Sequence, residues 1–309
     1  MKQELIFVVG CPRSGTTWLQ LLLSQHPAIA TLQETHLFPD YISPAFARWR
    51  SESQKARETG LTSLMSHSQF LDLWRQFAEE TLRVALVDKP NAAFILEKTP
   101  VHIHHGCEIL ELFPTAYFIH IIRDPRAVVA SLLDASRSWG RNFAPQTSLP
   151  AAEMWRDAVL DGRRIGTLTK RYMEVSYEVM LQRPEVELAR VIKAIGLDPD
   201  PGFCQRAAET CAAANISGRS WKAWVPKSME NIKGNTVRKG EAEGWRKELT
   251  RFQVTTVEYL TRELLNAYGY TPEGRQGTLS TLRLRICGLL ARCGHRIGRR
   301  LRGAIRALK

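Results

Sequence analysis

The chain has 309 residues, of which 44% are hydrophobic, 8% aromatic and 24% charged, and its formal net charge is +12. These ordinary apolar and aromatic fractions exclude a disordered chain, and the length is sufficient to bury a sizeable core. No apolar run reaches membrane-spanning length, so the composition fits a soluble globular protein.

The first predicted element is a buried strand over residues 5–9, a run of Leu, Ile, Phe and Val. A tight turn of small residues follows from Gly10 to Gly15, and leucines at 19 and 21–23 then indicate a helix. Backbone N–H groups of such a turn point inward, and the helix N-terminus adds partial positive charge. The segment therefore predicts a cradle for a phosphate-like anion, although strand–turn–helix units also occur as plain structure.

This turn departs from the nucleotide-triphosphate pattern G-x-x-x-x-G-K-[ST]. Gly10 to Thr17 has the glycine spacing, but Thr16 stands where that pattern needs a lysine, and Arg13 is the cation of the loop. A γ-phosphate site is therefore poorly supported. A shorter anion on a 5′-nucleotide fits the loop better.

Two further strands are predicted downstream. Residues 94–98 read as a strand that ends in Lys98, with a helix entered through Pro100. Residues 116–122 form a second apolar run, which ends at Arg123. Ligands of open parallel sheets bind outside the carboxyl ends of the strands, and an arginine there can grip a phosphate with two parallel N–H donors.

The residues after Arg123 have the signature of a helix start. Asp124 suits the N-cap, Pro125 suits the first turn, and Ser131 lies two turns along the helix. An Arg–Asp pair that merely caps this helix is the alternative interpretation. With the strands above, the pattern predicts an α/β protein with a P-loop-like three-layer α/β/α fold and a central parallel sheet.

The loop and the later strand–Arg123 segment together resemble the sulfotransferase family, whose members use 3′-phosphoadenosine 5′-phosphosulfate as donor. The resemblance implies a 5′-phosphosulfate loop at the first turn and a 3′-phosphate site at Arg123 and Ser131. The residues that match the 5′-phosphosulfate loop are Arg13, Ser14, Gly15, Thr16, Thr17 and Trp18.

Two other segments extend this resemblance over most of the first 270 residues. Residues 171–180 are similar to the family strand that carries an adenine-contacting tyrosine, here Tyr177. Arg238, Lys239 and Gly240 resemble a late basic loop that closes over the 3′-phosphate in cytosolic members.

The resemblance also assigns catalytic roles. Glu34 lies in a His-Pro…Glu-Thr stretch like the one in which tyrosine-modifying members place their general base. Arg13 and Lys98 would stabilise the leaving oxygen and the transferring sulfonate. Cytosolic relatives place a catalytic histidine two residues after the lysine, but Pro100 stands there, so the chain is closer to the bacterial and protein-tyrosine type than to the cytosolic type.

Three histidines follow Pro100. His102, His104 and His105 are the fallback candidates for the base, and we interpret them as the polar face of a helix. Without a matching carboxylate or cysteine cluster, their spacing is a weak metal signal, and we expect no metal.

The predicted function is transfer of a sulfonate group to a hydroxyl acceptor: a carbohydrate, a lipid or a small metabolite. One alternative is a P-loop nucleotide kinase, and another is a membrane-recruited nucleotide-binding module without catalysis. The motifs leave the identity of the acceptor and the oligomeric state open.

The basic charge belongs to the C-terminus. After Glu273 the chain has ten cations and no acidic residue, which leaves a net charge of +2 for the rest. We expect a catalytic domain over 1–272 and a basic amphipathic tail over 273–309. Its leucines and isoleucines at three- and four-residue steps favour an anionic membrane surface, with packing on the body as the alternative. The tail lacks interleaved aromatic residues, so we expect no nucleic-acid partner.

The expected location is the cytoplasm, with the tail peripheral at the inner membrane face. Only four residues precede the first strand, which argues against a signal peptide, and the six cysteines show no paired framework.

Overall fold

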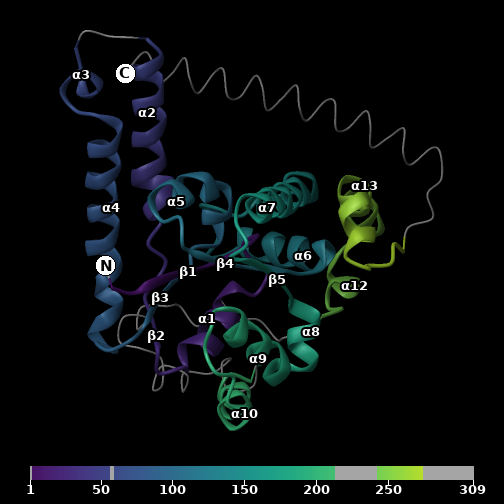
Figure 1. Ribbon diagram of the computed structural model, residues 1–309. Coiled ribbons are helices and arrows are strands. Elements are labelled where there is room, and N and C mark those ends of the chain that lie inside the picture. Colours follow the sequence, from purple (N-terminus) through teal and green to yellow (C-terminus); the bar gives the residue numbers. More distant parts are fainter. Residues whose placement is uncertain (1, 56–58, 213–241, 274–309) are drawn as a thin grey trace. The chain divides into compact units, whose positions relative to one another are not determined.

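A five-stranded parallel sheet forms the centre of the computed structural model, which describes residues 2–55, 59–212 and 242–273 (Figure 1). The strand order is β2-β3-β1-β4-β5, and every pair of neighbours is parallel. This confirms the predicted central parallel sheet. The strands are Glu4–Val9 (β1), Ile29–Thr31 (β2), Phe94–Glu97 (β3), Tyr117–Ile122 (β4) and Tyr172–Ser176 (β5).

The strands form where the sequence has runs of β-branched and aromatic residues, which suit a sheet covered on both faces. Five of the six residues of β1 are buried, and so are five of the six in β4. β3 ends at Glu97, one residue earlier than expected, where its pairing with Phe7 of β1 also ends. Lys98 therefore begins the loop.

Helices and helical turns connect the strands. The α-helices up to β4 are Thr16–Ser24 (α1), Ser43–Gln54 (α2), Leu61–Leu64 (α3), His67–Arg83 (α4) and Gly106–Leu112 (α5). The later α-helices are Pro125–Ser136 (α6), Ser148–Leu168 (α7), Tyr177–Gln182 (α8), Pro184–Ala194 (α9), Pro201–Thr210 (α10), Trp245–Glu248 (α12) and Arg251–Ala267 (α13). Tighter or wider helical turns are Phe38–Ile42 (η1), Val84–Val87 (η2) and Pro100–His105 (η3).

The chain divides into two compact units. The first comprises Met1–Arg123 and Asp157–Glu243, and it contains the whole sheet. The second comprises Asp124–Arg156 and Gly244–Lys309, with α6, α12 and α13. One of the boundaries between the units falls inside α7.

The sheet of the first unit is covered on both faces. On one face, α1, α8, α9 and α10 pack their apolar side chains on the strands, with Leu22, Val175 and Val191 fully buried in this core. On the other face Phe7 stacks on Phe118, with ring centroids 5.7 Å apart. Helices α5 and α7 lie on that side of the sheet (Figure 1). This arrangement is the predicted three-layer fold.

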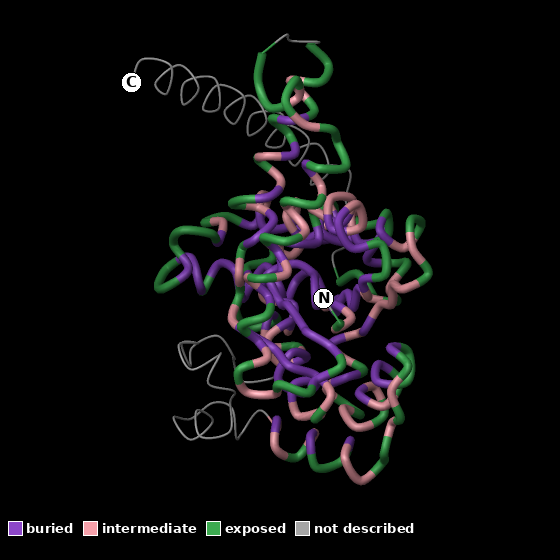
Figure 2. The backbone as a smooth tube through the Cα atoms, turned by 60° about the vertical axis from the view of Figure 1, so that its left-hand side comes forward, coloured by how far each residue is buried: buried purple, intermediate pink, exposed green. Residues whose placement is uncertain are grey.

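Helices α2 and α4 extend from the first unit as an antiparallel pair (Figure 1). Trp49 of α2 stacks on Phe70 of α4 with ring centroids 4.3 Å apart. Figure 2 shows much of the chain at this end as exposed, in contrast to the buried strands. Leu73 and Phe77 on α4 are 55% and 44% exposed.

A lysine closes the C-terminal end of α1. Nζ of Lys89 donates to the carbonyl oxygens of Ser24, His26 and Ile29, the last two at 2.8 and 3.0 Å. Helix C-termini leave backbone carbonyls without partners inside the helix, and a cation there satisfies them and complements the helix dipole. Lys89 thereby fixes the turn between α1 and β2.

The second unit is organised around a buried arginine. The guanidinium of Arg126 pairs with Asp124 at 2.7 Å and with Glu258 of α13 at 2.8 Å, and it lies over the ring of Trp245 at 4.2 Å. It also donates to the carbonyl oxygen of Thr271 at 2.9 Å. As predicted, Asp124 caps α6, since its carboxylate accepts from the backbone N–H of Arg126. One side chain therefore joins α6 to α12, α13 and the segment beyond it.

Within the described ranges, none of the helices combines the length and the apolar character needed to cross a bilayer. The expected tail over 273–309 lies outside those ranges except for Glu273, so its membrane role stays a prediction. The domain boundary at 272 also stays a prediction.

Replacement of Arg126 by methionine should destabilise the protein by about 3–5 kcal/mol, because it would leave two buried carboxylates without their cation. Chemical denaturation, monitored by circular dichroism, measures this loss. Arg206→Met is a matched control, since the Arg206 side chain is 71% exposed. Equal unfolding free energies for the two variants would contradict the central role of Arg126.

Candidate functional site

The loop from Gly10 to Gly15 has two glycine positions that leave no room for a side chain. Gly10 lies at φ +151°, and a Cβ there would come within 2.7 Å of the carbonyl oxygen of Ile121. Gly15 lies at φ +101°, and its Cβ would meet the ring of Tyr177 at 2.5 Å. Arg13 also has a positive φ, 76°, although it is not glycine. Such backbone strain is concentrated at functional sites.

The loop also fits an anion. Gly15 is the N-cap of α1 and offers no side-chain cap, so the first-turn N–H groups, including those of Thr16 and Thr17, face the loop. Ser14 is 1% exposed, and its Oγ has no hydrogen-bond partner among the described residues. An orphaned buried hydroxyl beside a helix N-terminus is the arrangement expected for a phosphate or sulfonate oxygen. Cys11 is no nucleophile here, because burial raises the pKa of its thiol.

Arg123, Tyr177 and Trp18 converge beside this loop. The guanidinium of Arg123 lies over the ring of Tyr177 at 4.2 Å and donates to the carbonyl oxygen of Arg13 at 3.4 Å. Trp18 meets the same tyrosine ring edge-on at 5.7 Å, and its indole N–H donates to the carbonyl oxygen of Cys211 at 2.9 Å. Tyr177 therefore supports Gly15, Trp18 and Arg123 at once.

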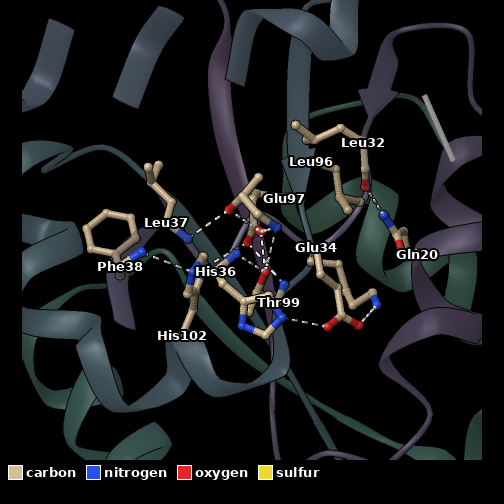
Figure 3. Close-up of polar contacts among 12 residues, drawn as sticks. Gln20, Leu32, Glu34, His36, Leu37, Phe38, Leu96, Glu97, Thr99 and His102 are labelled. Atoms are coloured by element: carbon tan, nitrogen blue, oxygen red, sulfur yellow. Dashed lines mark hydrogen bonds and ion pairs between the residues drawn. The ribbon is translucent and has the colours of Figure 1, made fainter. Parts of the chain in front are cut away.

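A second cluster contains the carboxylate expected to act as base. Nζ of Lys98 contacts Oε1 of Glu34 as an ion pair, and Nε2 of His36 lies 3.5 Å from Oε2 of the same carboxylate (Figure 3). Lys98 is 2% exposed, so its charge depends on this partner. Two of the predicted catalytic residues, Glu34 and Lys98, are thus in contact.

Charge pairing dominates the titration of Glu34. Burial raises its pKa, but the charge of Lys98 and the hydrogen bonds from His36 and Lys98 together lower it by more, and the resulting pKa is about 2. The pKa of His36 is raised, chiefly by its hydrogen bond to Glu34. At neutral pH Glu34 is therefore a carboxylate that can accept a proton.

Beside this pair lies a buried network centred on Glu97 (Figure 3). Its carboxylate contacts Nδ1 of His102 at 2.8 Å and accepts from the hydroxyls of Thr35 and Thr99 at 3.0 and 2.6 Å. The interpretation of His102 as part of a polar helix face is wrong, because this side chain is fully buried. Its Nε2 accepts from the N–H of Phe38 at 3.4 Å.

The other two fallback histidines have partners of their own. His104 contacts Asp161 at 2.6 Å, and His105 contacts the hydroxyl of Ser43 at 2.7 Å. The pKa of His105 is lowered by burial. Among the described histidines, it is His36 that reaches Glu34.

The first unit thus brings together most of the predicted residues. The N–H of Gly10 donates to the carbonyl oxygen of Pro100 at 3.2 Å, which links the anion loop to the segment that follows Lys98. Ser131 lies buried on α6 in the second unit. Arg238, Lys239 and Gly240 lie outside the described residues.

The sequence interpretation assigned no role to His36 or Glu97. The sequence nevertheless contains a feature that points to each of these two residues. His36 follows Glu34 by two residues, and Glu97 is an acidic residue at the end of an apolar strand, where a buried charge needs partners.

Comparisons with known proteins identify the family of this chain. A sequence model of the sulfotransferase family matches residues 5–201. A protein-tyrosine sulfotransferase of Drosophila melanogaster is 28% identical over 198 residues, which cover 62% of this chain and 38% of that protein. The nodulation protein NoeE of Sinorhizobium fredii is 26% identical over 287 residues, 85% of this chain and 65% of that protein. The chain therefore matches less than two thirds of the length of either relative.

Solved structures share the fold. The sulfotransferase domain of the Synechococcus olefin synthase has a TM-score of 0.55 at 20% identity and covers 88% of this chain and 97% of that chain. A mouse sulfotransferase complexed with PAP has a TM-score of 0.56 at 17% identity and covers 92% of this chain and 89% of that chain. Because the family match covers more than half of the sequence and includes the loop, Glu34, Lys98 and Arg123, the chain belongs to the sulfotransferase family.

Proposed function

We propose that the protein transfers a sulfonate group from 3′-phosphoadenosine 5′-phosphosulfate to a hydroxyl acceptor, with Glu34 as general base. The observation that carries the proposal is the position of an anion loop beside an ion-paired carboxylate at one edge of the sheet. The family membership supports the reaction class.

The donor would be held at both of its anionic ends. The 5′-phosphosulfate occupies the loop, where Ser14 and the first turn of α1 donate and Arg13 neutralises the leaving phosphate. Arg123 holds the 3′-phosphate, and Tyr177 contacts the adenine. The residues proposed around the 5′ end are Arg13, Ser14, Gly15, Thr16, Thr17 and Trp18.

The chemical step is one displacement at sulfur. The acceptor oxygen forms a bond to sulfur as the bond from sulfur to the bridging phosphate oxygen breaks, and the acceptor proton passes to Glu34. Lys98 and Arg13 stabilise the charge that develops on the sulfonate and on the leaving oxygen. The products are a sulfate ester and adenosine 3′,5′-bisphosphate, and no metal takes part.

Donor binding would also adjust the base. While Lys98 pairs with Glu34, the carboxylate is a weak base, since its pKa is about 2. When the lysine instead meets the sulfonate oxygens, the largest lowering influence on Glu34 weakens, and burial then raises its pKa. The carboxylate becomes a stronger base at the moment when donor and acceptor are both present.

The acceptor is proposed as a carbohydrate, lipid or small-metabolite hydroxyl. The names of several relatives specify protein tyrosine as a further kind of acceptor. An acceptor screen with radiolabelled donor would separate these classes.

Isothermal titration calorimetry should detect binding of adenosine 3′,5′-bisphosphate. Arg123→Met should weaken this binding by about tenfold to a hundredfold, the effect of one charge-assisted contact. Arg206→Met removes the same charge from an exposed position on α10 and should bind like the parent protein. Absence of binding to the parent protein, with tight binding of ATP and Mg²⁺, would favour a kinase instead.

Glu34→Gln should lower sulfonate turnover by roughly 10²–10⁴, the usual contribution of a general base, while product binding stays unchanged. Steady-state assays with radiolabelled donor measure the first quantity and calorimetry the second. Glu80→Gln on α4 is the control, since Glu80 contacts only Arg83 in an exposed ion pair. Full turnover by Glu34→Gln would eliminate Glu34 as the base.

Lys98→Met should raise the pKa of Glu34, because the burial that remains favours the neutral acid. Glu34 acts as base only when ionised, so activity is lost as pH falls through its pKa. The acid limb of kcat/KM should therefore move from far below neutral in the parent to higher pH in the variant. A carboxyl NMR titration of Glu34 checks the shift directly, and an unmoved pKa would refute the coupling.

A further inference from the structure

Glu97 is a carboxylate without access to substrate. It is 1% exposed and lies at the last position of β3, one residue before Lys98. Both of its oxygens accept hydrogen bonds from the protein itself, so this buried carboxylate does not face the donor or the acceptor. Its effect on the reaction must pass through the groups that it holds.

The contacts of Glu97 divide between its two oxygens. Oε1 accepts from the N–H of Thr35 at 3.3 Å, from the hydroxyl of Thr35 at 3.0 Å and from the hydroxyl of Thr99 at 2.6 Å. Oε2 accepts from the N–H of Thr99 at 3.1 Å and contacts Nδ1 of His102 at 2.8 Å. Burial raises the pKa of Glu97, but His102 and the threonine donors lower it by more than burial raises it. The net shift of the pKa is therefore downward.

An ionised carboxylate accepts hydrogen bonds and donates none, which sets the direction of the whole network. Both threonine hydroxyls must donate to Glu97, so their lone pairs are left to accept from the backbone. Thr35 Oγ1 accepts from the N–H of Leu37 at 3.2 Å, and Thr99 Oγ1 accepts from the N–H groups of Thr35 and His36 at 3.1 and 3.4 Å. The backbone N–H groups of three consecutive residues therefore donate hydrogen bonds to this network.

These three N–H groups belong to the segment that carries Glu34. His36 takes a left-handed backbone, φ 48°, which is uncommon for a residue other than glycine and needs such support. The start of the segment is fixed separately by Gln20, whose Nε2 donates to the carbonyl oxygen of Leu32 at 2.8 Å (Figure 3). Glu34 thus lies between two anchored points.

Lys98 is held by the same network from the other side. It lies between Glu97 and Thr99, and both neighbours are members of the network. The segment with Glu34 and the strand end with Lys98 therefore have one shared anchor. We infer that Glu97 is the positioning residue of this site, which aligns the Glu34 carboxylate with the Lys98 ammonium and with His36 for proton removal. This inference rests on the proposed function, because it assigns Glu34 the role of base.

Glu97→Gln is the direct test, because it keeps the shape and changes one acceptor oxygen into an NH₂ donor. At either oxygen position, the new NH₂ would face N–H or O–H groups that donate hydrogen bonds to Glu97 in the parent protein. The segment with Glu34 must therefore shift. A displacement of about 1 Å at a catalytic group can cost about a hundredfold in rate, so kcat should fall by roughly tenfold to a hundredfold. Binding of adenosine 3′,5′-bisphosphate should change by less than about twofold, because the loop, Arg123 and Tyr177 have no contact with Glu97.

A double-mutant cycle separates positioning from a general loss of structure. If Glu97 acts through Glu34, then Glu97→Gln should have little further effect on kcat in a Glu34→Gln background. Full additivity of the two losses would overturn the inference. So would a loss of product binding that parallels the loss of kcat.

A measurement that does not depend on enzyme activity can test this inference separately from the proposed function. The pKa of Glu34, followed by carboxyl NMR, should rise in Glu97→Gln because the contacts from Lys98 and His36 loosen. An unchanged pKa would overturn the inference even if the enzyme is a sulfotransferase with Glu34 as base. A shifted pKa in a protein whose Glu34→Gln variant retains full turnover would instead remove the base assignment alone.

Thr35→Val supplies a second variant if Glu97→Gln fails to fold. It removes one hydroxyl donor to Glu97 and one acceptor for Leu37, and it should raise the pKa of Glu34 in the same direction by a smaller amount. Thr81→Val on α4 is the matched control, since its hydroxyl donates only to the carbonyl oxygen of Phe77. Equal pKa values of Glu34 in the two threonine variants would contradict the network.

Discussion

The common direction of the five strands determines where the chemistry can occur. Parallel strands place their carboxyl ends along one edge, and each strand of this sheet is followed there by part of the site. The anion loop follows β1, Glu34 follows β2, Lys98 follows β3, Arg123 follows β4 and Tyr177 follows β5. These residues are far apart in the sequence, and hydrogen bonding between the strands is what makes them neighbours.

The strand order then separates two tasks. β2 and β3 lie on one side of β1, and they carry the ion pair of Glu34 with Lys98. β4 and β5 lie on the other side, and they carry the stacked pair of Arg123 with Tyr177. The loop after β1 lies between these two pairs of residues. In the proposed reaction, the bond to sulfur would break at this loop.

Burial and pairing of charge oppose each other throughout the site. Lys98 and Glu97 are nearly inaccessible, and an isolated charge in such a position would be too costly to keep. Each is compensated by a specific partner: Glu34 for the lysine, and His102 with the threonine donors for Glu97. The same compensation keeps the pKa of Glu34 low. In the second unit, the buried charge of Arg126 is compensated in the same way by Asp124 and Glu258.

The sequence by itself determined the parallel sheet, the tight turn after β1 and the family, because these depend on local patterns. Apolar runs specify buried strands, and small residues at Gly10 and Gly15 specify a turn that larger side chains would block. It also indicated Glu34 and Lys98 through the resemblance. Only the tertiary structure decided which partners each charge has. His102 is a core residue because η3 turns it toward Glu97, and His36 reaches Glu34 because a left-handed backbone directs it there. The contacts of Thr35 with Glu97 and of Lys98 with Glu34 join segments more than sixty residues apart, and no periodicity or spacing along the chain encodes their geometry.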